Sequence, residues 1–200
     1  MSENNEDLIA LFSDCPFAEW EAFPRRCAKR QTVWSEPVDA WVSYLPDRER
    51  TDPLFVKWLW ERGYLIHVVP AIGLSKSMQR ASYVMQLTPK IQCPSATECF
   101  HATPLLNAEG IEQRGLLPGR ECGESATGRL DASHYIHVSL TLTDAREWAT
   151  KERLLSIGSA AVFRVDPAAA GLKLFRDPFS RTGYILDAFH VADLYIRRVA

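Results

Sequence analysis

The pattern of apolar and polar positions predicts alternating helices and strands in the first half of the chain. Residues 54–63 combine an apolar run with a closing glycine, Gly63, and predict a short helix. The apolar run of residues 64–69 predicts a buried strand. A second helix is predicted over residues 76–87, with Ser75 as its candidate cap. We therefore expect a small α/β or helical unit here.

Predicted strands outnumber predicted helices in the second half. The strands are expected at residues 98–103, 135–140, 160–166, 172–176, 183–187 and 194–197. The helices are expected early, at residues 105–114, closed by Gly115, and at residues 145–155, after a cap at Thr143 and Asp144. This order favours an α+β domain with a split, mostly antiparallel sheet over a doubly wound parallel sheet.

The pattern of predicted elements and the distribution of tryptophan change near Pro94. This change predicts two units, residues 1–94 and residues 95–200. All but one of the six tryptophans lie in the first unit. We interpret them as core residues, because large aromatic side chains contribute most to a core by burial. A surface for a protein partner is the alternative function of this half.

Length and charge narrow the function classes. The 200 residues are 46% hydrophobic and 24% charged, which is enough for one core or for one core and a small appendage. A net charge of −2 gives no overall attraction to nucleic acid or to an anionic membrane. No segment approaches the roughly 18 apolar residues that a membrane span needs. Residues 1–7 are polar and acidic, unlike a signal peptide. We expect a protein that folds in the cytoplasm without a membrane partner.

The cysteines are odd in number, widely spaced and without a CxxC pair. They are Cys15, Cys27, Cys93, Cys99 and Cys122. A disulfide framework or a zinc site needs close-spaced, convergent residues, so neither is indicated and no metal is expected. We expect reduced and mostly buried thiols.

Three short motifs of the second half occur in a characteristic order. Residues 100–103 read Phe-His-Ala-Thr, residues 111–116 read Ile-Glu-Gln-Arg-Gly-Leu, and residues 137–140 read His-Val-Ser-Leu. Together they resemble the ADP-ribosyltransferase fold, most closely its NAD-dependent RNA 2′-phosphotransferase branch. That branch has an aromatic-His-Gly-Thr motif, an Ile followed by Gly-Leu, and a His-aliphatic-Ser motif. The resemblance covers about half the chain, and Ala102 stands at the place of the family's glycine.

The resemblance implies an enzyme that uses NAD as co-substrate, releases nicotinamide and transfers ADP-ribose. The acceptor would be macromolecular, either a protein side chain or a nucleic-acid group. In the family, the first His binds a ribose hydroxyl while the backbone beside it pairs with the nicotinamide amide. By this resemblance His101 is the ribose ligand and the main chain at Ala102 is the nicotinamide clamp, with Thr103 in the same cofactor site. Such a site must hold NAD and exclude water.

Alternation along residues 135–140 places three polar side chains on one face. They are Tyr135, His137 and Ser139, and the other face is apolar. His137 and Ser139 would project the same way, ~7 Å apart, and both could touch one nucleotide. We expect them to act beside the nicotinamide, with Tyr135 as a candidate for stacking on it. The alternative is a polar face that meets only solvent.

Several arginines are candidates for phosphate contacts, because guanidinium groups suit phosphate oxygens. Arg120 and Arg129 lie in the loop between the two histidine motifs, where this fold often holds the pyrophosphate. Arg181, near a later turn, is the candidate for a catalytic arginine; ordinary solvated surface arginines are the alternative. The strand at residues 183–187 carries Tyr184 and no Glu, whereas toxin-type transferases of this fold carry a Glu there, which favours the phosphotransferase branch.

Two other functions remain open from the sequence. One is removal of a 2′-phosphate from RNA with NAD. The other is a catalytically degenerate domain of the same fold that recruits a partner through the tryptophan-rich first half.

Overall fold

The protein is described from a computed structural model. The structure describes residues 6, 10–16, 32–35, 40–45, 53–70, 83–93, 95–118, 134–150, 159–178 and 180–200. The chain forms two compact units, Met1–Lys90 and Ile91–Ala200. The predicted cap at Ser75 and the loop arginines Arg120 and Arg129 lie outside the described residues.

Among its described residues, the first unit contains a four-stranded antiparallel sheet and the helix α3. The strands stand in the order β1-β2-β4-β3, and their bounds are Thr32–Ser35, Ala40–Leu45, Tyr83–Pro89 and Tyr64–Pro70 respectively. The helix α3, Pro53–Glu61, confirms the prediction and ends just before Gly63, whose φ of 86° favours glycine. The strand β3 confirms the other prediction, and its Leu65 and Ile66 are buried.

The predicted helix at residues 76–87 is wrong where the structure describes it. Residues 83–89 form β4, which pairs with β2 on one side and with β3 on the other. The segment begins Tyr-Val and continues to Leu-Thr, residues that suit a strand packed between neighbours. Pairing on both sides, which is not visible locally, decides the conformation.

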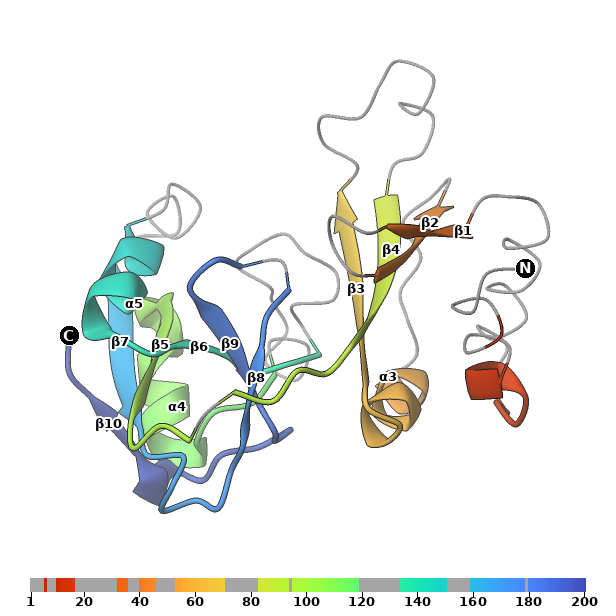
Figure 1. Ribbon diagram of the computed structural model, residues 1–200. Helices are drawn as coiled ribbons and strands as arrows, with labels where there is room; N and C mark the ends of the chain where they lie inside the picture. Colours follow the sequence, from red (N-terminus) through yellow and green to blue (C-terminus); the bar gives the residue numbers. More distant parts are fainter. Residues whose placement is uncertain are drawn as a thin grey trace. The chain divides into compact units, whose positions relative to one another are not determined.

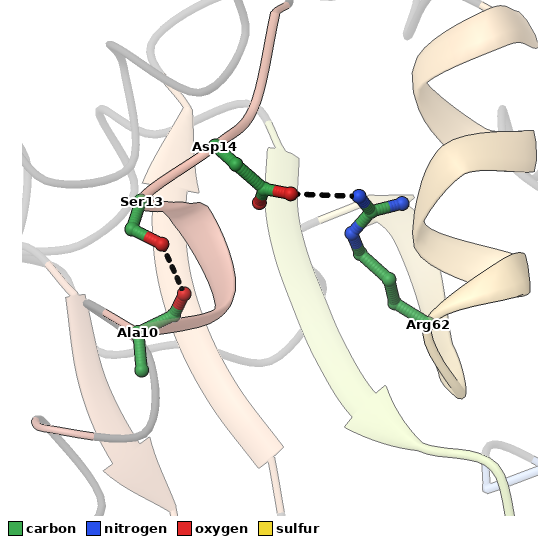
Figure 2. Close-up of polar contacts among 4 residues, drawn as sticks. All are labelled: Ala10, Ser13, Asp14 and Arg62. Atoms are coloured by element: carbon green, nitrogen blue, oxygen red, sulfur yellow. Dashed lines mark hydrogen bonds and ion pairs between the residues drawn. The ribbon is translucent and has the colours of Figure 1, made fainter.

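An aromatic cluster joins residues 10–16 to α3. The rings of Phe12, Phe55 and Trp58 stack with centroids 5.9 to 6.2 Å apart. The guanidinium carbon of Arg62 lies 4.0 Å from the centre of the Trp58 ring. Figure 2 shows the same arginine directed at Asp14, with Nη2 2.9 Å from Oδ2. Trp58 is buried, in agreement with its interpretation as a core residue.

The second unit is built on a six-stranded antiparallel sheet in the order β10-β7-β5-β6-β9-β8. The strands are β5 (Cys99–Pro104), β6 (His137–Ser139), β7 (Ala160–Val165), β8 (Leu174–Arg176), β9 (Gly183–Leu186) and β10 (Ile196–Arg198). The prediction of an α+β unit with a mostly antiparallel sheet is confirmed.

Two helices cover opposite faces of this sheet. The helical elements are η2 (Leu105–Asn107), α4 (Ala108–Arg114), α5 (Leu142–Ala149) and η3 (Asp193–Tyr195). Ala108 of α4 packs in one core with Cys99 and Phe163, whereas Ala145 of α5 packs with Phe100. Because Cys99 and Phe100 are neighbours on one strand, their side chains lie on opposite faces. Figure 1 shows both helices beside β5 and β7, with the β8–β9 pair at the other side of the sheet.

The helix α5 begins earlier than predicted. Its N-cap is Thr141, whose hydroxyl oxygen accepts a hydrogen bond from the Asp144 main-chain N–H at 3.1 Å. The Thr141 hydroxyl in turn donates to the Asp144 carboxylate. The predicted cap at Thr143 is therefore wrong by two residues, because a threonine and an acidic residue three positions later cap each other.

In the described part of the chain, no helix has the length and apolar character that crossing a bilayer requires.

Candidate functional site

The pairing between β5 and β6 is interrupted almost as soon as it begins. These strands pair at one position, Phe100 with Ser139, whereas β5 and β7 pair at all six positions from Cys99 to Pro104. The residues of β5 after Phe100 therefore have no register partner on β6 among the described residues. We call this interruption the β5–β6 break.

The main chain of Ala102 is directed at the β5–β6 break. The main-chain N–H and C=O of Val162 on β7 form hydrogen bonds with the main chain of residues 199–200, which follow β10. These groups therefore point away from β5. Successive residues of a strand direct their main-chain groups to opposite sides. Phe163 therefore turns its groups to β5, where it pairs with His101. The next residue of β5, Ala102, turns its N–H and C=O away from β7 and toward β6.

The carbonyl group of His137 faces the same break from the other strand. The Ile136 carbonyl accepts a hydrogen bond of 3.0 Å from the Leu186 N–H, so Ile136 faces β9 and the next residue faces β5. There the His137 carbonyl lies 2.8 Å from Nδ1 of His101. In a continuous ladder, the Ala102 N–H would donate to this His137 carbonyl. Here the imidazole of His101 donates to it instead.

This contact fixes the state of the His101 ring. A carbonyl oxygen only accepts, so Nδ1 of His101 carries the hydrogen and donates it. Burial lowers the pKa of His101, and its hydrogen bond to the His137 carbonyl offsets this effect only in part. The ring is therefore neutral near pH 7, with Nε2 as an acceptor.

The two imidazole rings lie on opposite faces of the sheet. His137 shares its face with Ser139, which pairs with Phe100, whereas His101 lies on the alternate face of β5 with Thr103. His101 therefore meets the main chain of His137 and not its ring. The expectation that the two imidazoles converge on one shared pocket is therefore wrong, because neighbouring residues of β5 direct their side chains to opposite faces and, of the two histidines, only His137 lies on the face of Phe100.

The His137 ring has a partner that the sequence did not single out. Its Nδ1 lies 3.2 Å from Oδ2 of Asp177, a carboxylate that is only 2% exposed. The Tyr135 ring stands edge-on to the His137 ring, with 6.3 Å between centroids. The other ring nitrogen, Nε2, is buried and has no hydrogen-bond partner among the described residues, although 26% of the side chain is exposed.

The alternative of a solvent-facing polar face is wrong. Tyr135 is 3% exposed and Ser139 is 4% exposed. The reason is that β6 is an interior strand and that α5 packs against β5, β6 and β7. Thr103 is also buried, and its hydroxyl accepts a hydrogen bond of 3.2 Å from the Asn107 amide. These polar side chains belong to the interior of the unit.

The arginine and tyrosine candidates of the last strands lie elsewhere. Arg181 is exposed in the turn between β8 and β9, and among the described residues it forms no hydrogen bond or ion pair. Tyr184 pairs with Val138 and packs against the core on the α4 side, opposite the His137 ring. The structure thus brings together the candidates of β5 and β6, but it does not join these two to them.

Asp177 depends on a close approach in the turn that follows β8. Its main-chain N–H donates to the Gly183 carbonyl at 3.2 Å, and its carbonyl accepts from Ser180 N–H at 3.2 Å. A Cβ atom added at Gly183 would lie 2.6 Å from Cβ of Ser180 and 3.5 Å from Oδ2 of Asp177. The sequence signal was an aspartate in a turn after an apolar strand, but its contact with His137 spans 40 residues.

No three His, Cys, Asp or Glu side chains gather as metal ligands in the part of the chain that the structure describes. In comparisons with known proteins, no family model and no curated protein matches the chain.

Proposed function

We propose that residues 91–200 form an NAD-dependent ADP-ribosyltransferase of the ADP-ribosyltransferase fold, similar to the RNA 2′-phosphotransferase branch. It transfers ADP-ribose to a protein side chain or a nucleic-acid group and releases nicotinamide. The observation that carries the proposal is the β5–β6 break, toward which Ala102 turns its main-chain N–H and C=O.

A carboxamide is complementary to such a main-chain edge. The two groups of Ala102 point the same way and offer one donor and one acceptor. The nicotinamide carboxamide offers an acceptor oxygen and two N–H donors, so it can replace the missing strand partner. Ala102 has no register partner on β6 among the described residues, so a ligand that bonds to its main chain would extend the ladder at this point.

The side chains around the break suit the charge that develops in the reaction. The bond between the ribose C1′ and the nicotinamide nitrogen breaks, and its electron pair leaves with the neutral nicotinamide. The acceptor then forms a bond to C1′ and loses a proton to solvent. Because His101 is neutral, its Nε2 can accept a hydrogen bond from a ribose hydroxyl without opposing the positive transition state. His137, whose side chain is 26% exposed, acts on the nicotinamide side.

Nicotinamide release and label transfer test the proposal. The full chain is incubated with NAD labelled in the adenine ring, in the presence of protein and RNA acceptors. We expect nicotinamide release with labelling of one acceptor, and a loss of at least about tenfold in His101→Ala and in His137→Ala. His190→Ala is the matched control, because His190 is exposed and bonds to the Arg114 carbonyl. Folded protein that neither binds NAD nor releases nicotinamide would leave the partner-binding module as the function.

A second candidate is the RNA 2′-phosphotransferase reaction itself. The observation that favours it is β9, which reads Gly-Tyr-Ile-Leu and carries no Glu to activate a protein acceptor. The same incubation with RNA that carries a 2′-phosphate then yields a cyclic phosphate of ADP-ribose and dephosphorylated RNA. Label that remains on the acceptor favours the first candidate.

A further inference from the structure

The His137–Asp177 contact determines where the hydrogen of the His137 ring lies. A carboxylate accepts hydrogen bonds and cannot donate them, so Nδ1 of His137 carries the hydrogen toward Oδ2 of Asp177. In a neutral ring, Nε2 then has a free lone pair.

The main chain holds Asp177 in place independently of His137. Its N–H donates to the Gly183 carbonyl, and Gly183 pairs with Ser139 on β6. The carboxylate therefore comes from an element that is bonded to the same strand as His137. Its side chain is 2% exposed, so the contact is shielded from solvent.

We propose that Asp177 is a positioning residue, which holds His137 in the tautomer whose Nε2 accepts a hydrogen bond from NAD. The identity of this ligand rests on the proposed function. A buried acceptor without a partner is unfavourable, and a ligand N–H or O–H that bonds to it removes that cost. NAD offers two uncharged donors of this kind, the carboxamide and the ribose hydroxyls. A carboxylate in place of the carboxamide could only accept hydrogen bonds, so it could not donate one to Nε2 of His137.

The ring tautomer can be measured without NAD. Long-range ¹H–¹⁵N spectra of the full chain, labelled in histidine and assigned with His137→Gln, distinguish the two neutral forms. We expect the Nδ1–H form of His137 in the wild type and a mixture of forms in Asp177→Asn, because an amide can either accept or donate. The exposed Asp193 provides the control variant Asp193→Asn, which should keep the wild-type spectrum. An Nε2–H form of His137 in the wild type would overturn the proposal.

NAD binding gives the second measurement. We expect Asp177→Asn to bind NAD at least tenfold more weakly, and Asp193→Asn to bind it normally. The deamidated analogue, in which a carboxylate replaces the carboxamide, should bind at least tenfold more weakly than NAD, because it has no N–H to donate. Equal NAD affinity of the wild type and Asp177→Asn would overturn the proposal. If the tautomer changes as expected but NAD binds to neither protein, the positioning by Asp177 stands and the proposed function fails.

Discussion

Replacing Gly183 by alanine should disturb both the stability and the site of the second unit. The new Cβ would lie 2.6 Å from Cβ of Ser180, whereas carbon atoms in contact are about 3.5 to 4.0 Å apart. Rotation of the Ser180 side chain does not move its Cβ, so the turn must shift by about 1 Å. Overpacking of this kind costs about 1–3 kcal/mol. A shift of this size also separates Asp177 from His137, which are 3.2 Å apart.

A double-mutant cycle isolates this clash. Ser180→Gly removes the obstructing atoms, so Gly183→Ala should cost far less free energy of unfolding in that background than in the wild type. Gly110→Ala is the matched control: its nearest neighbour is the flexible end of Arg114, and alanine in a helix is neutral or stabilises by up to about 1 kcal/mol. The free energies come from denaturant unfolding followed by circular dichroism. A Gly183→Ala protein as stable as the wild type, or an equal cost in both backgrounds, refutes the reasoning.

The other predictions concern single residues of both units. Because the pKa of His101 in the folded protein is lowered from 6.5, the contribution of this residue to stability is complete above pH 6.5 and is lost as the pH falls below that value. The free energy of unfolding should therefore differ more between pH 7.5 and pH 5 in the wild type than in His101→Asn. Equal differences in the two proteins would contradict this prediction. Burial raises the pKa of Cys99 to about 12, so in peptide mapping iodoacetamide at pH 8 should modify the partly exposed Cys15 at least about a hundredfold faster; comparable rates would show that Cys99 is accessible. In the first unit, Phe55→Ala should cost about 3–5 kcal/mol in denaturant unfolding and Arg62→Ala about 1 kcal/mol, and the reverse order would refute the aromatic cluster as the main contact.

Local patterns predicted the elements whose conformation is decided locally. The helix that ends before Gly63 and the strand that follows it were predicted because a glycine and an apolar run mark them. Residues 83–87 were predicted as helix, because their pairing partners in β2 and β3 are distant in the sequence. Non-local pairing therefore accounts for this error.

The same distinction applies to the candidate site. Alternation correctly placed Tyr135, His137 and Ser139 on one face, but it could not show that α5 covers that face. The partner of His137 lies 40 residues away, and the β8–β9 turn that carries it becomes a neighbour only when β9 pairs with β6. The β5–β6 break is likewise a property of pairing, so the motif at residues 100–103 gave the residues and not the geometry.

The backbone amide of Ala102 provides the most direct test of the NAD site. Its ¹H–¹⁵N signal is followed while NAD is added to the full chain. The account predicts that this signal shifts strongly and saturably, because the carboxamide bonds to the main chain at the β5–β6 break. An Ala102 signal that stays unchanged at millimolar NAD, in folded protein, would contradict it.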